Sequence, residues 1–234
     1  MSASSYNFTR HKTSMYDMKE LAGPKIGEKA MDFSATTIDG QEVNLSDYYG
    51  KIIVLENGSI TCPQYVGNIS PMNDLAREFP GVEFVVLYTR EAHPGERIGA
   101  HKTLGDKIKR AKETQKRFNE QRTILVDSIE GTGHLAYGTL PDMVYIIAPD
   151  GTVAFRGKWN NASAIRKILQ KLVNNVSIEG MRSPFRIPPL AANVKAVIPA
   201  GIIAVADLMV CAPKIMWVHL KEEIQYGMSN SGTH

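Results

Sequence analysis

The chain has 234 residues, of which 43% are hydrophobic and 22% charged, with a net charge of +3 and only two cysteines. This composition excludes a disordered chain and a small disulfide-stapled fold, and the length allows one full domain plus a sizeable extra segment. Residues 1–10 contain no basic region followed by an apolar stretch. We therefore expect no secretory signal and a reducing, cytoplasmic setting.

The positive charge is concentrated in one segment. Nine Lys or Arg and three Asp or Glu lie between Arg97 and Arg122, so this segment is more positive than the whole chain. Apolar residues at helical spacing predict a basic amphipathic helix over residues 101–118. The segment has no interleaved aromatic residues, so we expect no nucleic-acid binding. Its basic face is either a solvated helix surface or a surface that attracts an anion near a site.

Short regular elements follow a polar N-terminal arm, residues 1–26. Two alternating segments around Asp39-Gly40 predict a β-hairpin. Continuous apolar runs further on are typical of strands buried on both faces of a sheet. The expected strands cover residues 32–38, 41–45, 52–55, 82–88, 123–126, 143–147 and 152–156, and the expected helices cover residues 63–79, 101–118 and 161–173.

The order of these elements predicts the fold class. Strands that alternate with helices indicate βαβ units with parallel strands, and Pro149-Asp150-Gly151 indicates a turn between two antiparallel strands. A hairpin, a βαβαβ unit and a final ββα unit are the order of a thioredoxin-like α/β fold. We expect a central mixed sheet with an N-terminal β-hairpin, in a domain of residues 27–175.

Residues 176–234 lie outside this pattern and are expected to form a mainly helical C-terminal extension. Its apolar segment, residues 196–213, is borderline in length for a membrane span and contains Pro199, Gly201 and the charged Asp207. A membrane span and a membrane-surface helix are therefore the less favoured interpretations. The extension and the N-terminal arm are instead expected to dock on the domain, on a second copy in a homo-oligomer, or on a protein partner.

Cys62 lies directly after the first buried strand, where open α/β sheets form their sites. Pro63 suits the first turn of the following helix. Free backbone N–H groups at that helix N-terminus are expected to stabilise a thiolate and lower the pKa of Cys62. Ser59 and Thr61 add hydroxyl groups beside it. Position 65 is Tyr rather than Cys, so a C-x-x-C disulfide reductase is excluded.

Candidate proton-transfer residues follow the next parallel strand. Glu91 and His93 emerge at the edge of the sheet that presents Cys62, and His101 begins the basic helix. A carboxylate and an imidazole beside a thiol are the groups that acid–base catalysis requires.

The remaining cysteine and histidines predict no second site. Cys211 lies in an apolar segment and is expected to be structural. It is also the one other thiol in the chain, and therefore the one residue that could form a resolving disulfide with Cys62. His134 and His219 have no companions at metal-ligand spacing, so we predict no metal.

Residues 30–173 resemble the iodothyronine deiodinase family, a thioredoxin-fold branch close to peroxiredoxins and glutathione peroxidases. Four segments carry the resemblance: Asn57–Pro63, where the family has selenocysteine followed by proline, Glu91-Ala92-His93-Pro94, His101 with its basic helix, and Ala136-Tyr137-Gly138 ahead of Val144-Tyr145-Ile146. The resemblance implies that Cys62 occupies the selenocysteine position. It also implies a hydrogen-bonding and proton-transfer network made of Ser59, Thr61, Glu91, His93 and His101.

The chain departs from the family at three points. Sulfur replaces selenium, which should slow dehalogenation. The arginine thought to hold the substrate carboxylate in the family matches Met143 here. Leu140-Pro141 resembles the segment of thioredoxins and peroxiredoxins in which a cis-proline faces the thiol. We therefore expect Pro141 and Met143 on the substrate side of the site.

These observations predict a thiol-dependent oxidoreductase without a bound cofactor. The Cys62 thiolate would attack a soft atom of a small-molecule substrate, either an aromatic halogen or a peroxide oxygen. An external thiol such as glutathione or thioredoxin would then restore Cys62. Two alternatives stay open: a one-cysteine peroxiredoxin-like peroxidase, and a thioredoxin-fold scaffold subunit of a larger complex.

Overall fold

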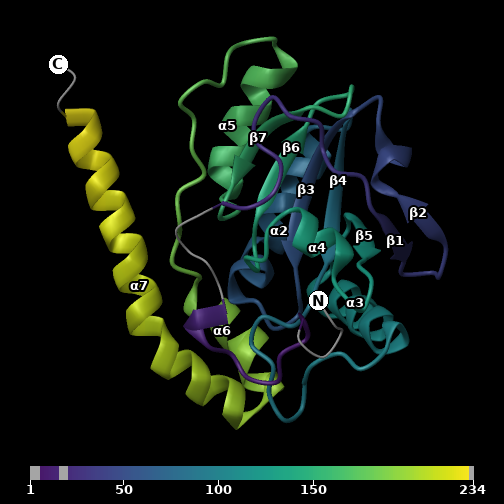
Figure 1. Ribbon diagram of the computed structural model, residues 1–234, viewed down its shortest axis with the longest axis vertical. Coiled ribbons are helices and arrows are strands. Elements are labelled where there is room, and N and C mark those ends of the chain that lie inside the picture. Colours follow the sequence, from purple (N-terminus) through teal and green to yellow (C-terminus); the bar gives the residue numbers. More distant parts are fainter. Residues whose placement is uncertain (1–5, 16–20, 232–234) are drawn as a thin grey trace.

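The computed structural model describes residues 6–15 and 21–231, and its centre is a seven-stranded sheet in the order β2-β1-β5-β4-β3-β6-β7 (Figure 1). The three inner strands β3, β4 and β5 are parallel, and all other neighbouring strands pair antiparallel. The strands are β1 (Ser34–Thr37), β2 (Glu42–Asn44), β3 (Ile52–Gly58), β4 (Val82–Tyr88), β5 (Thr123–Val126), β6 (Val144–Ile147) and β7 (Val153–Gly157).

The predicted hairpin forms β1 and β2. Gly40 has a φ of 91°, a conformation that favours glycine, and its N–H donates to the Thr37 carbonyl at 2.9 Å. The hairpin extends the sheet beyond β5, because β1 pairs with β5. The expected hairpin and buried parallel strands are therefore confirmed.

Three helices cover one face of the sheet: α2 (Pro63–Glu78), α3 (Leu104–Phe118) and α5 (Ala162–Val173). Alternate strand residues point to the two faces. On β3, Val54 packs with the residues of α2 and α5, whereas Ile53 and Leu55 pack in a separate cluster on the opposite face. The short helix α4 (Thr132–Ala136), which the sequence did not predict, packs with that opposite cluster through Ala136.

Helix α3 begins three residues later than predicted. Thr103 caps it, because the Thr103 hydroxyl accepts the Asp106 N–H while the Asp106 carboxylate accepts the Thr103 N–H, each at 3.1 Å. His101 consequently lies in the preceding loop. One basic residue of α3 is buried: Lys107 Nζ donates to the Ser128 carbonyl at 2.9 Å, and burial lowers the pKa of Lys107 to about 8.

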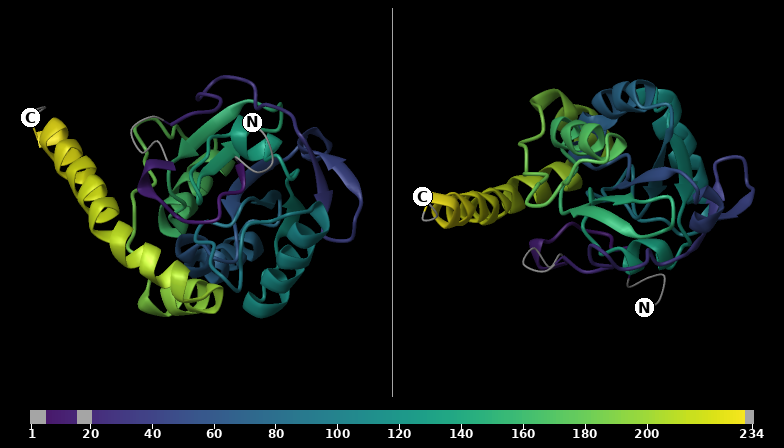
Figure 2. Two further views of the ribbon diagram at one scale, coloured as in Figure 1. Left: turned by 60° about the horizontal axis from the view of Figure 1, so that its bottom comes forward. Right: turned by 90° about the horizontal axis from the view of Figure 1, so that it is seen from above.

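The C-terminal extension forms an extended stretch and then two helices, α6 (Leu190–Val197) and α7 (Ile202–Ser231). Pro199 and Gly201 separate them, and Gly201 has a φ of 118°. Helix α6 packs on α2, whereas α7 runs along the outside of the domain and projects from it (Figures 1 and 2).

One side of α7 holds it to the domain. The Asp207 carboxylate accepts from Arg10 Nε at 2.7 Å and from Nη2 at 2.5 Å, and Glu222 pairs with Lys158 Nζ at 2.8 Å. Its other side is exposed and apolar. Within α7, residues Ile202–Glu222 have a mean hydropathy of 1.6, a length and composition that allow a membrane crossing. The exposed apolar residues are Ile202, Met209, Val210, Met216, Trp217, Leu220 and Ile224.

Candidate functional site

Cys62 lies between β3 and α2 and is the N-cap residue of that helix. Pro63 occupies the first helical turn, as predicted. The thiol is almost completely buried, with 1% of the residue exposed. The backbone N–H groups of Tyr65 and Gln64, at the start of the helix, favour the thiolate form of its sulfur. The position at the helix N-terminus is therefore the predicted one.

The electrostatics at Cys62 differ from the prediction. Burial raises the pKa of the thiol well above its ordinary value, and the negative charge of Glu56 adds to this. The backbone donors from Tyr65 and Gln64 act in the opposite direction and do not compensate. The expected lowering of the pKa at the helix N-terminus is therefore wrong for this closed arrangement, because desolvation outweighs the dipole. The sulfur rests as a neutral thiol.

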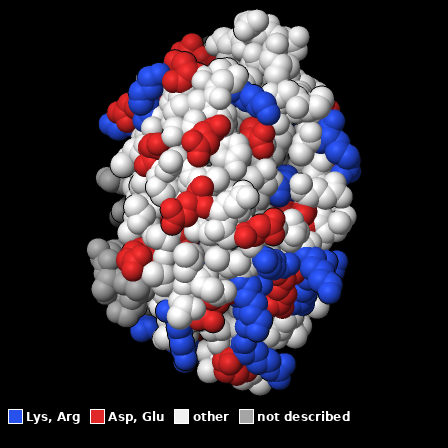
Figure 3. Space-filling view, turned by 90° about the vertical axis from the view of Figure 1, so that its right-hand side faces the viewer, with Lys and Arg blue, Asp and Glu red and all other residues white. Residues whose placement is uncertain are grey.

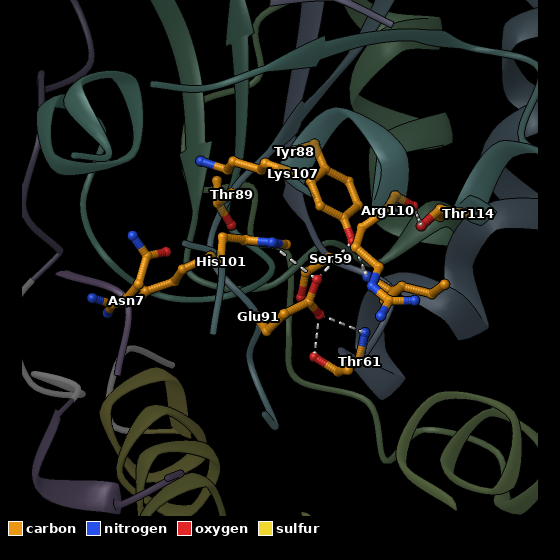
Figure 4. A network of polar contacts seen from close by, with 12 residues as sticks. Asn7, Ser59, Thr61, Tyr88, Thr89, Glu91, His101, Lys107, Arg110 and Thr114 are labelled. Atoms are coloured by element: carbon orange, nitrogen blue, oxygen red, sulfur yellow. Dashed lines mark hydrogen bonds and ion pairs between the residues drawn. The ribbon is translucent and has the colours of Figure 1, made fainter. Parts of the chain in front are cut away.

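Glu91 is the centre of a buried network that joins the two loops at the ends of β3 and β4 (Figure 4). Its Oε2 accepts from the Thr61 hydroxyl at 2.5 Å and the Thr61 N–H at 3.2 Å. Its Oε1 accepts from the Tyr88 hydroxyl at 2.8 Å and lies 3.2 Å from His101 Nε2. Burial acts to raise the pKa of Glu91, but His101 and the two hydroxyl donors outweigh it, so this pKa lies below its ordinary value.

Ser59 and Thr61 connect the same two loops. The Ser59 hydroxyl accepts the Ala92 N–H at 3.1 Å, and the Thr61 hydroxyl accepts the His93 N–H at 3.2 Å. Both side chains are buried. The structure thus brings four predicted residues, Thr61, Ser59, Glu91 and His101, together beside the backbone of Cys62.

His93 faces the N-terminal segment rather than Glu91. Its ring packs against the His11 ring with the centroids 4.3 Å apart and the planes tilted by 36°, and His11 Nδ1 lies 3.0 Å from the Ala92 carbonyl oxygen. Burial, followed by the charge of His11, lowers the pKa of His93 well below its ordinary value, so this imidazole is neutral near pH 7. No sequence signal marked His11 as part of the site.

A second charged network, also missed from the sequence, is buried beneath α2. Arg122 pairs with Glu56 on β3 and with Glu120, to which its Nε donates at 2.8 Å. The Tyr65 hydroxyl donates to Glu120 at 3.0 Å. The signal that could have found this network is Glu56 itself, because a carboxylate inside an apolar strand requires a buried partner.

Asp142 adjoins this second network. The Asn160 N–H donates to its carboxylate at 3.2 Å. Burial, followed by the charge of Glu56, raises the pKa of Asp142 well above its ordinary value. Asp142 is therefore held as a neutral acid beside Glu56.

Two expectations for this segment are wrong, the cis peptide bond at Pro141 and the direction of the Met143 side chain. The described residues contain no cis peptide bond, so the prediction of a cis-proline is wrong. Pro141 and Asp142 instead form a trans turn whose Asp142 carbonyl accepts the Asn160 N–H at 3.0 Å. The Met143 side chain packs in the core cluster on the face opposite the helices, whereas Cys62 packs on the helix face.

Cys211 lies in α7 and is buried. Its sulfur is 4.0 Å from the His11 carbonyl oxygen, and both cysteines are free thiols. Among the residues that the structure describes, no group of three or more His, Cys, Asp and Glu is arranged to hold a metal ion.

Solved structures define the fold class. A hypothetical protein from Sinorhizobium meliloti has a TM-score of 0.58 over 69% of this chain and 91% of that one, at 13% identity. A protein assigned as the thiol:disulfide interchange protein DsbE, from Chlorobium tepidum, has a TM-score of 0.51 over 65% of this chain and 99% of that one, at 18% identity. The predicted thioredoxin-like α/β fold with a helical C-terminal part is confirmed.

The sequence comparisons define the family. The family model for iodothyronine deiodinase matches residues 2–173. Type I iodothyronine deiodinase of Xenopus laevis is 24% identical over 164 residues, which are 65% of this chain and 64% of that protein. Type II iodothyronine deiodinase of Petromyzon marinus is 28% identical over 116 residues, which are 45% of this chain and 40% of that protein. The chain belongs to the iodothyronine deiodinase family, which confirms the resemblance and the expectation of an enzyme family.

Proposed function

We propose that this protein is a thiol-dependent oxidoreductase that carries out reductive dehalogenation, with Cys62 as the nucleophile. The observation that carries the proposal is the Glu91 network, which ties a histidine and a buried carboxylate to the residue next to a free thiol at a helix N-terminus. This is a thiol with acid–base groups beside it in a chain of the deiodinase family.

The proposed reaction first requires the thiolate. Because burial favours the neutral thiol, substrate entry must be accompanied by loss of the Cys62 proton. The proposed acceptor is His93, because its Nδ1 has no hydrogen-bond partner within the described part of the chain. Burial lowers the pKa of His93, so in this scheme substrate or water enters the site before the proton moves. The packing of the His93 ring against His11 makes the N-terminal segment part of the proposed site.

The thiolate then attacks the halogen of an aromatic substrate. A sulfur–halogen bond forms, the carbon–halogen bond breaks, and the ring carbon takes a proton supplied through His101, which Glu91 orients. An external thiol attacks the Cys62 sulfur, releases halide and forms a mixed disulfide, and a second thiol restores Cys62. Thr61 and Ser59 position the two loops in this scheme, because their hydroxyls are engaged by Glu91 and by backbone N–H groups.

Turnover by Cys62→Ser tests the proposal. The wild-type protein with excess dithiothreitol should release iodide from 4-hydroxy-3-iodobenzoate, and Cys62→Ser should lower this rate to background. Cys211→Ser is the matched control and should keep the wild-type rate, because the proposed cycle does not use it. Full activity in Cys62→Ser would overturn the proposal. Rapid sulfenic-acid formation by hydrogen peroxide, without iodide release, would replace it with the peroxidase alternative.

A further inference from the structure

A cleft of about 890 Å³ opens beside the Glu91 network. The loop of residues 95–102, the first turns of α3 and the N-terminal residues Asn7 and Thr9 line it. His101 contributes to its wall, while the Nε2 atom of the same ring lies 3.2 Å from Glu91 (Figure 4). The cleft is therefore the place where a small molecule from solvent can meet the buried network, and its volume is that of ordinary ligand sites.

The cleft is lined by four cationic side chains, Arg97, Lys102, Lys109 and Arg110. Arg110 pairs with Glu113 at 2.5 Å and is half-buried. The other three are exposed, and in the described ranges no acidic side chain forms an ion pair with them. Figure 3 shows basic side chains gathered on the face of the molecule where α3 lies.

The two carboxylates at the cleft, Glu96 and Asp106, offset only part of this charge, because four cationic side chains line the same cleft. Glu96 accepts the N–H groups of Ile202 and Ile203 at 2.6 and 3.1 Å, and it thereby caps α7. Asp106 caps α3 through the Thr103 N–H. Hydrogen bonds from backbone N–H groups lower the pKa of Glu96, so it stays ionised and committed to its helix. Three unpaired cations consequently face a solvent-filled cleft.

We propose that this cleft binds the carboxylate group of a small anionic molecule and holds it beside His101. Because the inference names the class of ligand for the dehalogenation site, it rests on the proposed function. A carboxylate held there lies on the cleft side of the His101 ring, whose Nε2 faces Glu91 at 3.2 Å. Two sources share this chemistry: an acidic substituent of the substrate, and a carboxylate-bearing thiol reductant.

Isothermal titration of the full-length Cys62→Ser protein tests the inference without turnover. The probes are 4-hydroxy-3-iodobenzoate for the substrate source and S-methylglutathione for the reductant source, with neutral 2-iodophenol for comparison. We expect saturable binding of one or both carboxylates, weakened at high salt, and about tenfold weaker binding after Arg97→Gln with Lys109→Gln. Binding of 2-iodophenol should not change. Which of the two carboxylates binds identifies the source.

Lys112→Gln with Lys116→Gln is the matched control, since both lysines are exposed on α3 outside the cleft. This variant should bind like the parent. Equal weakening in both double variants would show a long-range effect of net charge and would overturn the cleft, as would binding of neither carboxylate. Retained iodide release with no carboxylate binding would overturn only the proposal that the cleft binds a carboxylate. Carboxylate binding without any Cys62-dependent iodide release would overturn only the proposed function.

Discussion

The two buried carboxylates that adjoin Cys62 are compensated in different ways. Hydroxyls of Thr61 and Tyr88 and the ring of His101 compensate Glu91, and His101 opens onto the cationic cleft. Glu56 is compensated by the guanidinium of Arg122, whose side chain is 1% exposed. His101 of the first network reaches the cleft, whereas the side chains of the second network are closed to solvent. The region around Cys62 thus combines one buried network that reaches the cleft with another that is closed to solvent.

The second network also differs in its net charge. Glu120 and Glu56 both pair with Arg122, so one negative charge remains in the interior, and Asp142 stays neutral because a further charge would be costly. This excess negative charge contributes to the raised pKa of Cys62. Under the proposed function, Glu91 and His101 handle the proton, and the buried charge of Glu56 contributes to the raised pKa of Cys62.

Arg122→Met should have the largest effect, because it leaves Glu56 and Glu120 buried without a counter-charge. We expect a loss of about 3–5 kcal/mol in the free energy of unfolding, measured by urea denaturation. The control is Arg77→Met, which breaks an exposed pair with Asp74 and should cost less than about 1 kcal/mol. Equal losses in both variants would show that the second network is not a structural element.

Glu91→Gln should act mainly on chemistry. It keeps the shape of the side chain but removes the charge that faces His101, and we expect kcat for dehalogenation to fall about 100-fold. The pH profile of kcat should change as well, which a purely structural role would not produce. Glu83→Gln, at an exposed pair with Lys51, is the control and should keep the wild-type profile. An unchanged kcat in Glu91→Gln would contradict the proposed role of the Glu91 network in the reaction.

The pH dependence of stability should separate the two networks by sign. Glu91 has a pKa below its ordinary value of 4.5, so its stabilisation is present above pH 4.5 and is lost as the pH falls. Asp142 has a pKa above its ordinary value of 3.8, so the folded protein loses stability as the pH rises through 3.8. Relative to wild type, the free energy of unfolding of Glu91→Gln should increase toward acid pH. That of Asp142→Asn should increase toward neutral pH.

The measurement is urea unfolding between roughly pH 3 and 7, and each difference is limited to about 1.4 kcal/mol per pH unit. Slopes of the same sign for Glu91→Gln and Asp142→Asn would contradict the assignment of opposite pKa shifts to the two acids.

The sequence predicted the elements whose patterns are local. Alternating and continuous apolar runs located the hairpin and the inner strands. The parallel order then predicted that Cys62 and Glu91 meet, because the carboxyl ends of neighbouring parallel strands share one edge. The start of α3 was misplaced, since the capping pair Thr103 and Asp106 overrides the apolar pattern.

The features that the sequence did not predict depend on packing between segments that are distant along the chain. Glu56 and Arg122 lie 66 positions apart, and no periodicity links them. The direction of the Cys62 pKa shift required the depth of burial, which a sequence does not contain. His11 reaches the site only because the N-terminal segment folds back over Ala92.

The ion pair between Arg10 and Asp207 closes a loop across 197 positions and draws the two ends of the chain together. His11, the residue next to Arg10, packs against the His93 ring and lies against Cys211. The minimal unit that reproduces the site therefore extends past residue 173, where the family match ends, to the first turns of α7. Truncated variants of this protein should therefore keep or remove the N-terminal segment and α7 together.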